Sequence, residues 1–179
     1  MVTIISKDNP ILRQKAHPVP IGDIATPKIQ KIVADMQRAL HREDDGVAIA
    51  APQIGVPLRI FVVSGKIFDA DFVREEKKEF PADKKWPDDM VCVNPKITRR
   101  SKETKWVPEG CLSVRWLYGD TKRNVKVTLE AHDERGKKFT RGASGLLAQI
   151  FQHETDHLDG ILFIDHARDI EDLPPKQHK

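Results

Sequence analysis

The feature that most constrains the fold of this 179-residue chain is the pattern H-E-x-x-H at residues 153–157. It lies within an uninterrupted run from Leu146 to Leu158 that predicts an α-helix, which ends at Asp159-Gly160. Because a helix turns once in about 3.6 residues, His153 and His157 share one face and their imidazoles can bind one ion. A solvated helix with two surface histidines is the alternative, but chance should give this pattern in only about one such chain in a few hundred.

The remaining periodicity predicts one α+β domain. Residues 27–41 carry apolar side chains at helical spacing, with charged residues on the other face and Pro27 in the first turn. Strands before, between and after two helices, without an internal repeat or linker, indicate a single compact domain. Short or alternating apolar runs predict strands at residues 59–63, 90–94, 97–101, 125–131, 138–140 and 161–164, with a hairpin turn at 133–136.

Two segments lack this periodicity. Residues 65–90 are charged and aperiodic, which is typical of an extended surface loop. The end of the chain contains two adjacent prolines and few apolar residues. We therefore expect residues 1–165 to form the folded catalytic domain and residues 166–179 to form a flexible tail.

The composition is that of an ordinary water-soluble protein. The 30 basic and 27 acidic residues give a formal net charge of +3, which provides no strong electrostatic footprint for nucleic acid. No apolar run approaches the ~20 residues that a membrane span needs. The first ten residues lack the basic and apolar regions of a secretory signal. We expect a cytoplasmic protein with no DNA and no membrane partner.

A catalytic ion on His153 and His157 needs a third protein ligand and an open position for water. One candidate is a thiolate upstream. Cys92 lies in an apolar triplet that is typical of a buried, unreactive thiol, whereas Cys111 lies in a more polar segment. The residues alone leave open Cys111 and several downstream side chains, none of which has the spacing of known zinc peptidases: Asp159, Asp165, His166, Asp169, Glu171 and Asp172.

Three segments together resemble the peptide deformylase family. The family pattern G-x-G-[LI]-A-A-x-Q is similar to residues 46–53, E-G-C-L-S matches residues 109–113, and Q-H-E-x-D-H matches residues 152–157. The likeness runs from about Ile11 to Asp165, with the three segments in family order, and it is far more specific than the helix motif alone. It implies antiparallel or mixed β-sheets around a central metal-binding helix.

The resemblance also implies a metal centre. Cys111, His153 and His157 would hold one divalent ion, with a water completing the tetrahedron. A ligand set of this kind suits zinc on geometry, while the order of metal affinities leaves several other ions open. The resemblance favours Fe(2+) in the cell, with Zn(2+), Ni(2+) or Co(2+) as replacements.

The implied reaction is hydrolysis of an N-formylmethionyl peptide to formate and a free amino terminus. Glu154 would be the general base and then the general acid. The side-chain amide of Gln53 and the backbone N–H of Leu112 would donate to the developing oxyanion. Glu109 is expected to orient a neighbouring group rather than react, and Arg141 is a candidate partner for its carboxylate.

Helix geometry places a substrate pocket beside this site. Leu146, Gln149 and Ile150 precede His153 by seven, four and three residues and share its face. With Val47 and Leu112 they are expected to line a slot for an unbranched methionine side chain, although ordinary core packing is the alternative. The residues expected to bind substrate are Gly46, Val47, Ala48, Leu146 and Ile150.

The sequence departs from the family pattern around this pocket. Ala48 replaces the second glycine of the first segment, and Arg115-Trp116 stand where the family typically has a proline. These departures keep open a related N-acyl amidase and a non-catalytic, metal-stabilised peptide-binding module. The sequence also lacks the long C-terminal helix that contributes to ribosome docking in some members, so docking near the exit tunnel stays open.

Overall fold

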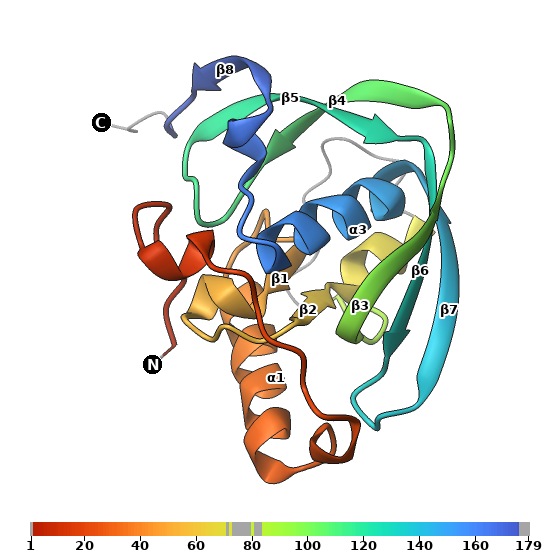
Figure 1. Ribbon diagram of the computed structural model, residues 1–179. Helices are drawn as coiled ribbons and strands as arrows, with labels where there is room; N and C mark the ends of the chain where they lie inside the picture. Colours follow the sequence, from red (N-terminus) through yellow and green to blue (C-terminus); the bar gives the residue numbers. More distant parts are fainter. Residues whose placement is uncertain (1, 71, 73–79, 81–83, 176–179) are drawn as a thin grey trace.

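The protein is an α+β domain in which two helices pack against two antiparallel sheets (Figure 1). The computed structural model describes residues 2–70, 72, 80 and 84–175. The helices are α1 (Pro27–Leu40) and α3 (Gly145–Leu158), close to the two helices that the sequence predicts. The predicted fold class is confirmed.

The larger sheet has five strands in the order β1-β2-β3-β6-β7, all antiparallel. The predicted hairpin is present, with residues 133–137 joining its last two strands. The two strands expected at 90–94 and 97–101 are one continuous strand with register shifts. The bounds are β1 (Ala48–Ala50), β2 (Ile60–Val63), β3 (Met90–Arg100), β6 (Lys126–His132) and β7 (Lys138–Ser144).

The helices cover opposite faces of the first strands of this sheet. In β2, Ile60 and Val62 belong to the core cluster that includes α1, whereas Phe61 and Val63 belong to the cluster that includes α3. Alternate side chains of a strand point to opposite faces, so all four residues are buried and the strand has no polar position. This double cover holds α3 in the middle of the molecule (Figure 1).

The smaller sheet has three strands in the order β4-β5-β8. They are β4 (Thr104–Gly110), β5 (Leu117–Asn124) and β8 (Arg168–Asp172). None of them was predicted, because their sequences are rich in charged residues and all of β8 is exposed. The expected tail at 166–179 is wrong for residues 168–172, since β8 pairs with β5. Residues 176–179 lie outside the described part of the chain.

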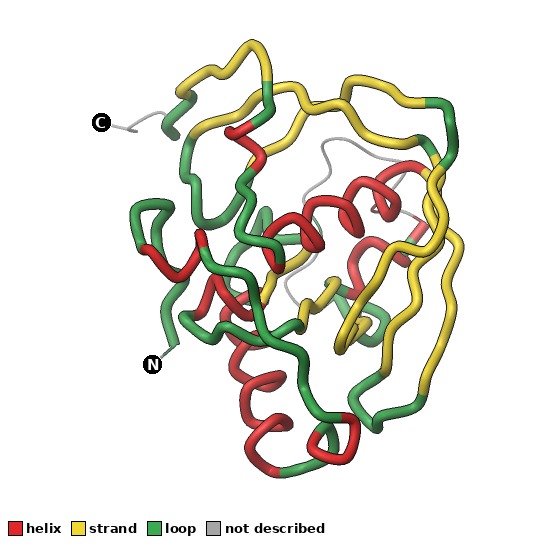
Figure 2. Tube along the Cα trace, in the orientation of Figure 1, coloured by secondary structure: helices red, strands yellow, loops and turns green. Residues whose placement is uncertain are grey.

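The structure differs from two further local predictions. Residues 161–164 form no strand. Phe163–Asp165 is a short 3-10 helix, and its Phe163 and the preceding Leu162 pack with Leu12 and Val114. The expected loop at 65–90 begins with another 3-10 helix, Gly65–Phe68, and residues 71, 73–79 and 81–83 of that prediction lie outside the described residues. The tube drawing in Figure 2 shows how much of the chain between the helices and strands is loop.

Across the described residues, no helix has the length and apolar character needed to span a membrane.

Candidate metal centre and active site

Cys111, His153 and His157 form one group that can hold a metal ion. Their ligand atoms all lie within 4.8 Å of one another, and Cys111 Sγ is 3.2 Å from His157 Nε2. The two imidazole rings, one turn apart on α3, have centroids 4.9 Å apart. Cys111 reaches them from the turn that follows β4, a segment that is distant in sequence. The spacing on α3 and the fold of the smaller sheet together therefore build a three-ligand site.

The thiol of Cys111 is prepared to act as a thiolate. Burial raises its pKa, but the charges and hydrogen bonds of His157 and His153 outweigh burial and lower the pKa to about 5. Only the thiolate form is a metal ligand, so this environment favours the binding-competent state at neutral pH. Cys92, by contrast, is fully buried in β3, and burial raises the pKa of its thiol well above the usual value.

A buried ion pair supports His153 from behind. Glu109 Oε2 lies 3.0 Å from His153 Nδ1, and both of its oxygens accept hydrogen bonds from the Arg123 guanidinium, at 2.7 and 2.9 Å. Arg123 also donates to Asp156 on α3 at 2.6 Å. When Nδ1 donates to a carboxylate, Nε2 is left to face an ion. Burial would raise the pKa of Glu109, but Arg123 and His153 hold it well below its usual range.

The expected orienting role of Glu109 fits this contact, but the expected partner was wrong. Arg141 lies on β7, opposite Leu129 of β6, and its guanidinium packs 5.6 Å from the Phe68 ring. Arg123 was missed because β5 was not predicted. In β5 every second residue is buried, namely Gly119, Thr121 and Arg123, so an arginine at an inward position was the available signal.

The carboxylate of Glu154 is buried, and one of its oxygens accepts no hydrogen bond from the described residues. Glu154 is 3 % exposed, and its Oε2 has no hydrogen-bond partner among the described residues. Burial raises its pKa to about 7, helped by the negative charges of Cys111 and Glu109 and opposed by His153 and His157. A buried polar atom without a partner is costly, so this oxygen fits a site that also receives a water or an ion.

Gln53 and Leu112 lie on the other side of the group. Gln53 accepts a hydrogen bond from the Ala50 N–H at 2.8 Å, and its amide Nε2 donates to Cys111 Sγ at 3.5 Å and to Ser113 Oγ at 3.2 Å. The amide is therefore held beside the ligand sulfur. The Leu112 N–H has no backbone acceptor among the described residues, which leaves it available as a donor.

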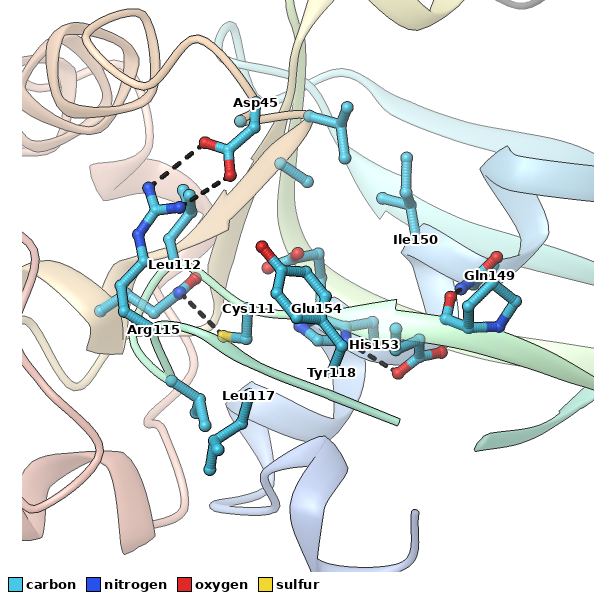
Figure 3. A pocket seen from close by; sticks show the side chains of 18 of the residues that line it. Asp45, Cys111, Leu112, Arg115, Leu117, Tyr118, Gln149, Ile150, His153 and Glu154 are labelled. Carbon is cyan, nitrogen blue, oxygen red and sulfur yellow. Dashed lines mark hydrogen bonds and ion pairs between the residues drawn. The ribbon is translucent and has the colours of Figure 1, made fainter. Parts of the chain in front are cut away.

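A pocket of about 310 Å³ opens in front of these groups (Figure 3). It brings together the H-E-x-x-H helix, the Gly46–Gln53 segment and the Glu109–Ser113 segment. All of the residues expected to bind substrate line it: Gly46, Val47, Ala48, Leu146 and Ile150. Gln149 lies at its edge and donates to the Pro108 carbonyl. Leu146 is partly exposed, so it belongs to the pocket wall rather than the core.

The sequence missed several residues at the outer part of the pocket. Tyr118 lines it and lies against Gly110, where an added Cβ would come within 2.7 Å of the tyrosine ring. Asp45 and Leu117 also line it. Arg115 and Trp116, which were noted only as departures from a pattern, line it as well.

Three side chains that can hold an ion, a buried carboxylate beside them and an adjoining pocket are together typical of a metal-dependent hydrolase site. Comparisons with known proteins agree with this class. The family described as polypeptide deformylase matches residues 1–172. The chain belongs to the polypeptide deformylase family, whose enzymes remove the formyl group from the amino terminus of nascent peptides.

Individual relatives give the extent of the likeness. The chain is 40% identical to peptide deformylase 2 of Clostridium acetobutylicum, over 90% of this chain and 91% of the relative. It is also 40% identical to peptide deformylase 1A of Arabidopsis thaliana, chloroplastic/mitochondrial, over 90% of this chain but only 60% of that relative's length. The chain therefore spans almost all of the bacterial relative but about three fifths of the plant relative.

Solved structures match the fold. A peptide deformylase from Legionella pneumophila superposes with a TM-score of 0.74 at 36% identity, covering 93% of this chain and 85% of that one. A Met-Ala-Ser-bound class I type b peptide deformylase from Acinetobacter baumannii superposes with a TM-score of 0.76 at 28% identity, covering 92% and 98%.

Proposed function

We propose that this chain hydrolyses the formyl group from N-formylmethionyl peptides with Cys111, His153 and His157 as metal ligands and Glu154 as the base. The observation that carries the proposal is the position of Glu154. Its carboxylate is buried next to the three ligand side chains and has one oxygen without a partner among the described residues. A purely structural metal site is usually closed by four protein ligands and needs no such base.

The residues divide the chemistry among themselves. A divalent ion held by Cys111, His153 and His157 would lower the pKa of a water from about 16 toward 7 and would supply a nucleophile for the formyl carbon at neutral pH. Glu154 would accept a proton from the attacking water and deliver it to the leaving nitrogen. In the metal-free site burial raises the pKa of Glu154 toward neutrality, which is the direction that suits a group that must gain and lose a proton.

Charge that develops on the formyl oxygen needs donors that are already in place. The Gln53 amide, fixed by Ala50 and Ser113, and the free Leu112 N–H are the donors that we assign. A donor of this kind lowers the activation barrier by about 3–4 kcal/mol by comparison with known oxyanion holes. The methionine side chain would occupy the apolar part of the pocket between Val47, Leu146 and Ile150.

The identity of the ion and the cellular setting are also proposals. One thiolate and two imidazoles fit Fe(2+), Zn(2+), Ni(2+) or Co(2+), and we propose Fe(2+) in the cell. Nascent peptides as substrate would place the enzyme in the cytoplasm near the ribosomal exit tunnel. Iron would make the purified enzyme sensitive to oxygen and peroxide.

A second candidate is an amidase for another N-acyl group. It is favoured by Ala48, which adds a methyl group to the pocket lining, and by Trp116 at its rim. Comparing the hydrolysis of formyl-Met-Ala-Ser and acetyl-Met-Ala-Ser separates the two candidates. Preference for the acetyl peptide would favour this amidase over the deformylase.

The main test is formate release by protein prepared without oxygen. We expect about one metal per chain and release of formate from formyl-Met-Ala-Ser. Glu154→Ala should lower the rate by a factor on the order of 10² or more, the usual contribution of general acid–base catalysis. Metal content measured on both proteins is the control. Equal rates at equal metal content would remove Glu154 from the mechanism.

A further inference from the structure

Arg115 joins two segments that lie at the mouth of the pocket. Its Nη1 donates to Asp45 Oδ2 at 2.7 Å, and its Nη2 donates to Asp45 Oδ1 at 3.3 Å and to Glu43 Oε2 at 2.5 Å. Figure 3 shows the guanidinium facing the Asp45 carboxylate at the edge of the pocket. The fork shape of arginine allows this bidentate contact with one carboxylate and a further contact with a second.

The two joined segments are the ones that form the catalytic pocket. Asp45 immediately precedes the Gly46–Gln53 segment, and Arg115 follows Cys111 by four residues. Gly46 is packed tightly against the end of α1 and the turn that follows it, since an added Cβ would meet Leu40 at 3.0 Å and Glu43 at 3.1 Å. A contact between Arg115 and this turn therefore bears directly on the width of the pocket mouth.

The backbone around Arg115 is also held in place. The Val114 N–H donates to the Cys111 carbonyl at 3.0 Å, and the Leu117 N–H donates to the Val114 carbonyl at 3.2 Å. Trp116 has a positive φ of 32°, a conformation that is uncommon for a large side chain. The guanidinium lies 5.1 Å from the Trp116 ring, within the range of a cation–π contact.

At the pocket mouth the negative charges outnumber the positive ones. One guanidinium faces two carboxylates, Glu43 and Asp45, and the neighbouring Lys66 donates to the Asp44 backbone carbonyl instead. At the inner end of the pocket Glu109 is already paired with Arg123. Among the described residues that line the pocket, Arg115 is the one with a guanidinium. Its charge therefore offsets the acidic turn for any peptide that passes the mouth.

We propose that Arg115 is a specificity-determining residue, which fixes the mouth of the pocket and sets the preference for the charge of the residues that follow the formylmethionine. With Arg115 in place, acidic residues at these positions are tolerated beside Glu43 and Asp45. Without it, the two carboxylates repel acidic peptides and attract basic ones. The inference rests on the proposed function, because it assumes that a peptide continues out of the pocket past this turn.

The test compares two substrates of opposite charge, formyl-Met-Lys-Lys and formyl-Met-Asp-Asp, both with amidated C-termini. The measured quantity is the ratio of their kcat/KM values, basic over acidic. We expect Arg115→Gln to raise this ratio about threefold to tenfold at low ionic strength, with the change in KM rather than kcat. The effect should shrink in 0.5 M salt, where the screening length falls to about 4 Å.

Three matched variants separate charge from shape and position. Arg115→Lys keeps the charge but loses the fork, so its ratio should stay near that of the unsubstituted protein while KM rises for both peptides. Asp45→Asn should lower the ratio. Arg38→Gln removes an arginine of α1 that pairs with Asp35 and does not line the pocket, so its ratio should not change. Metal content and thermal unfolding are measured for all four.

A ratio that is unchanged in Arg115→Gln, or that shifts as much in Arg115→Lys or Arg38→Gln, would overturn the proposal. Binding of the free peptides Met-Lys-Lys and Met-Asp-Asp, measured by calorimetry, gives a readout that needs no catalysis. If no formyl peptide is hydrolysed, the proposed function fails. The ratio of the two binding constants in Arg115→Gln then still decides the role of Arg115.

Discussion

Two arginines each face two carboxylates: Arg115 lies at the mouth of the pocket, and Arg123 lies behind Glu109 at its inner end. At the inner end Arg123 pairs with Glu109 and Asp156, and the side chains of Arg123 and Glu109 are 8% and 2% exposed. At the mouth Arg115 pairs with Glu43 and Asp45, and the side chains of Arg115 and Asp45 are 28% and 57% exposed. The chemical groups are the same, and burial is the main difference.

The difference in burial implies different roles for the two arginines. Removing one partner of a buried pair leaves a charge without compensation in a medium of low dielectric constant, which costs far more than removing an exposed partner. Arg123 is therefore part of the structure that positions His153. Arg115 is more exposed, so we expect its replacement to leave the fold intact and to act at the pocket mouth.

The largest expected effect is on stability at the inner end. Arg123→Met should destabilise the protein by about 3–5 kcal/mol, because Glu109 is left buried without its main counter-charge. Urea unfolding of the metal-free proteins measures this difference directly. Arg115→Met is the matched control, with an expected loss of at most about 1 kcal/mol. Equal losses in the two variants would remove the distinction between the ends of the pocket.

The next effect is on metal binding. Cys111→Ser replaces a thiolate with a hydroxyl, which is a poor ligand for the same ion. Loss of a residue that only supports a ligand lowers metal affinity by up to about 10²-fold, so loss of a ligand should lower it by more than about 10²-fold. Competition with a chelator of known affinity measures the loss. Cys92→Ser is the control for thiol number, although it adds a buried hydroxyl to the core. Unchanged metal content and activity in Cys111→Ser would exclude this cysteine as a ligand.

The smallest effect is expected at Ala48. Ala48→Gly removes a methyl group from the pocket lining, so KM for formyl-Met-Ala-Ser should change by less than about fivefold while kcat stays the same. A glycine within β1 should also lower stability by about 0.5–1 kcal/mol. Steady-state kinetics over a range of peptide concentrations separates the two constants. A tenfold change in kcat would show that this position affects the chemical step.

The inner end of the pocket was largely predictable from the sequence, and the reason is physical. His153, Glu154 and His157 are related by the repeat of one helix, and their mutual position follows from the spacing alone. Cys111 and Gln53 belong to short segments whose resemblance to a family is specific. The structure brings all five together, as those segments imply.

The parts that could not be predicted depend on strand pairing. Glu109 meets Arg123 only because β4 and β5 form a hairpin, and neither strand has the apolar alternation that identifies β6. The contact of Arg115 with Glu43 and Asp45 joins residues about seventy positions apart. An ion pair between residues far apart in the chain produces no local sequence pattern. The sequence therefore showed that Arg115 departs from the family pattern but not which residues it contacts.

The pairing of β8 with β5 has a consequence for how the protein can be handled. An unpaired outer strand offers its backbone groups to other chains, and β8 covers that edge of β5 with a short outer strand in which four of five residues are charged. The Leu173 N–H also donates to the Trp116 carbonyl at 2.9 Å, so residues after 165 reach back to the pocket mouth. A truncation at residue 165 would therefore expose the edge of β5 to other chains and remove the hydrogen bond that Leu173 makes to Trp116 at the pocket mouth.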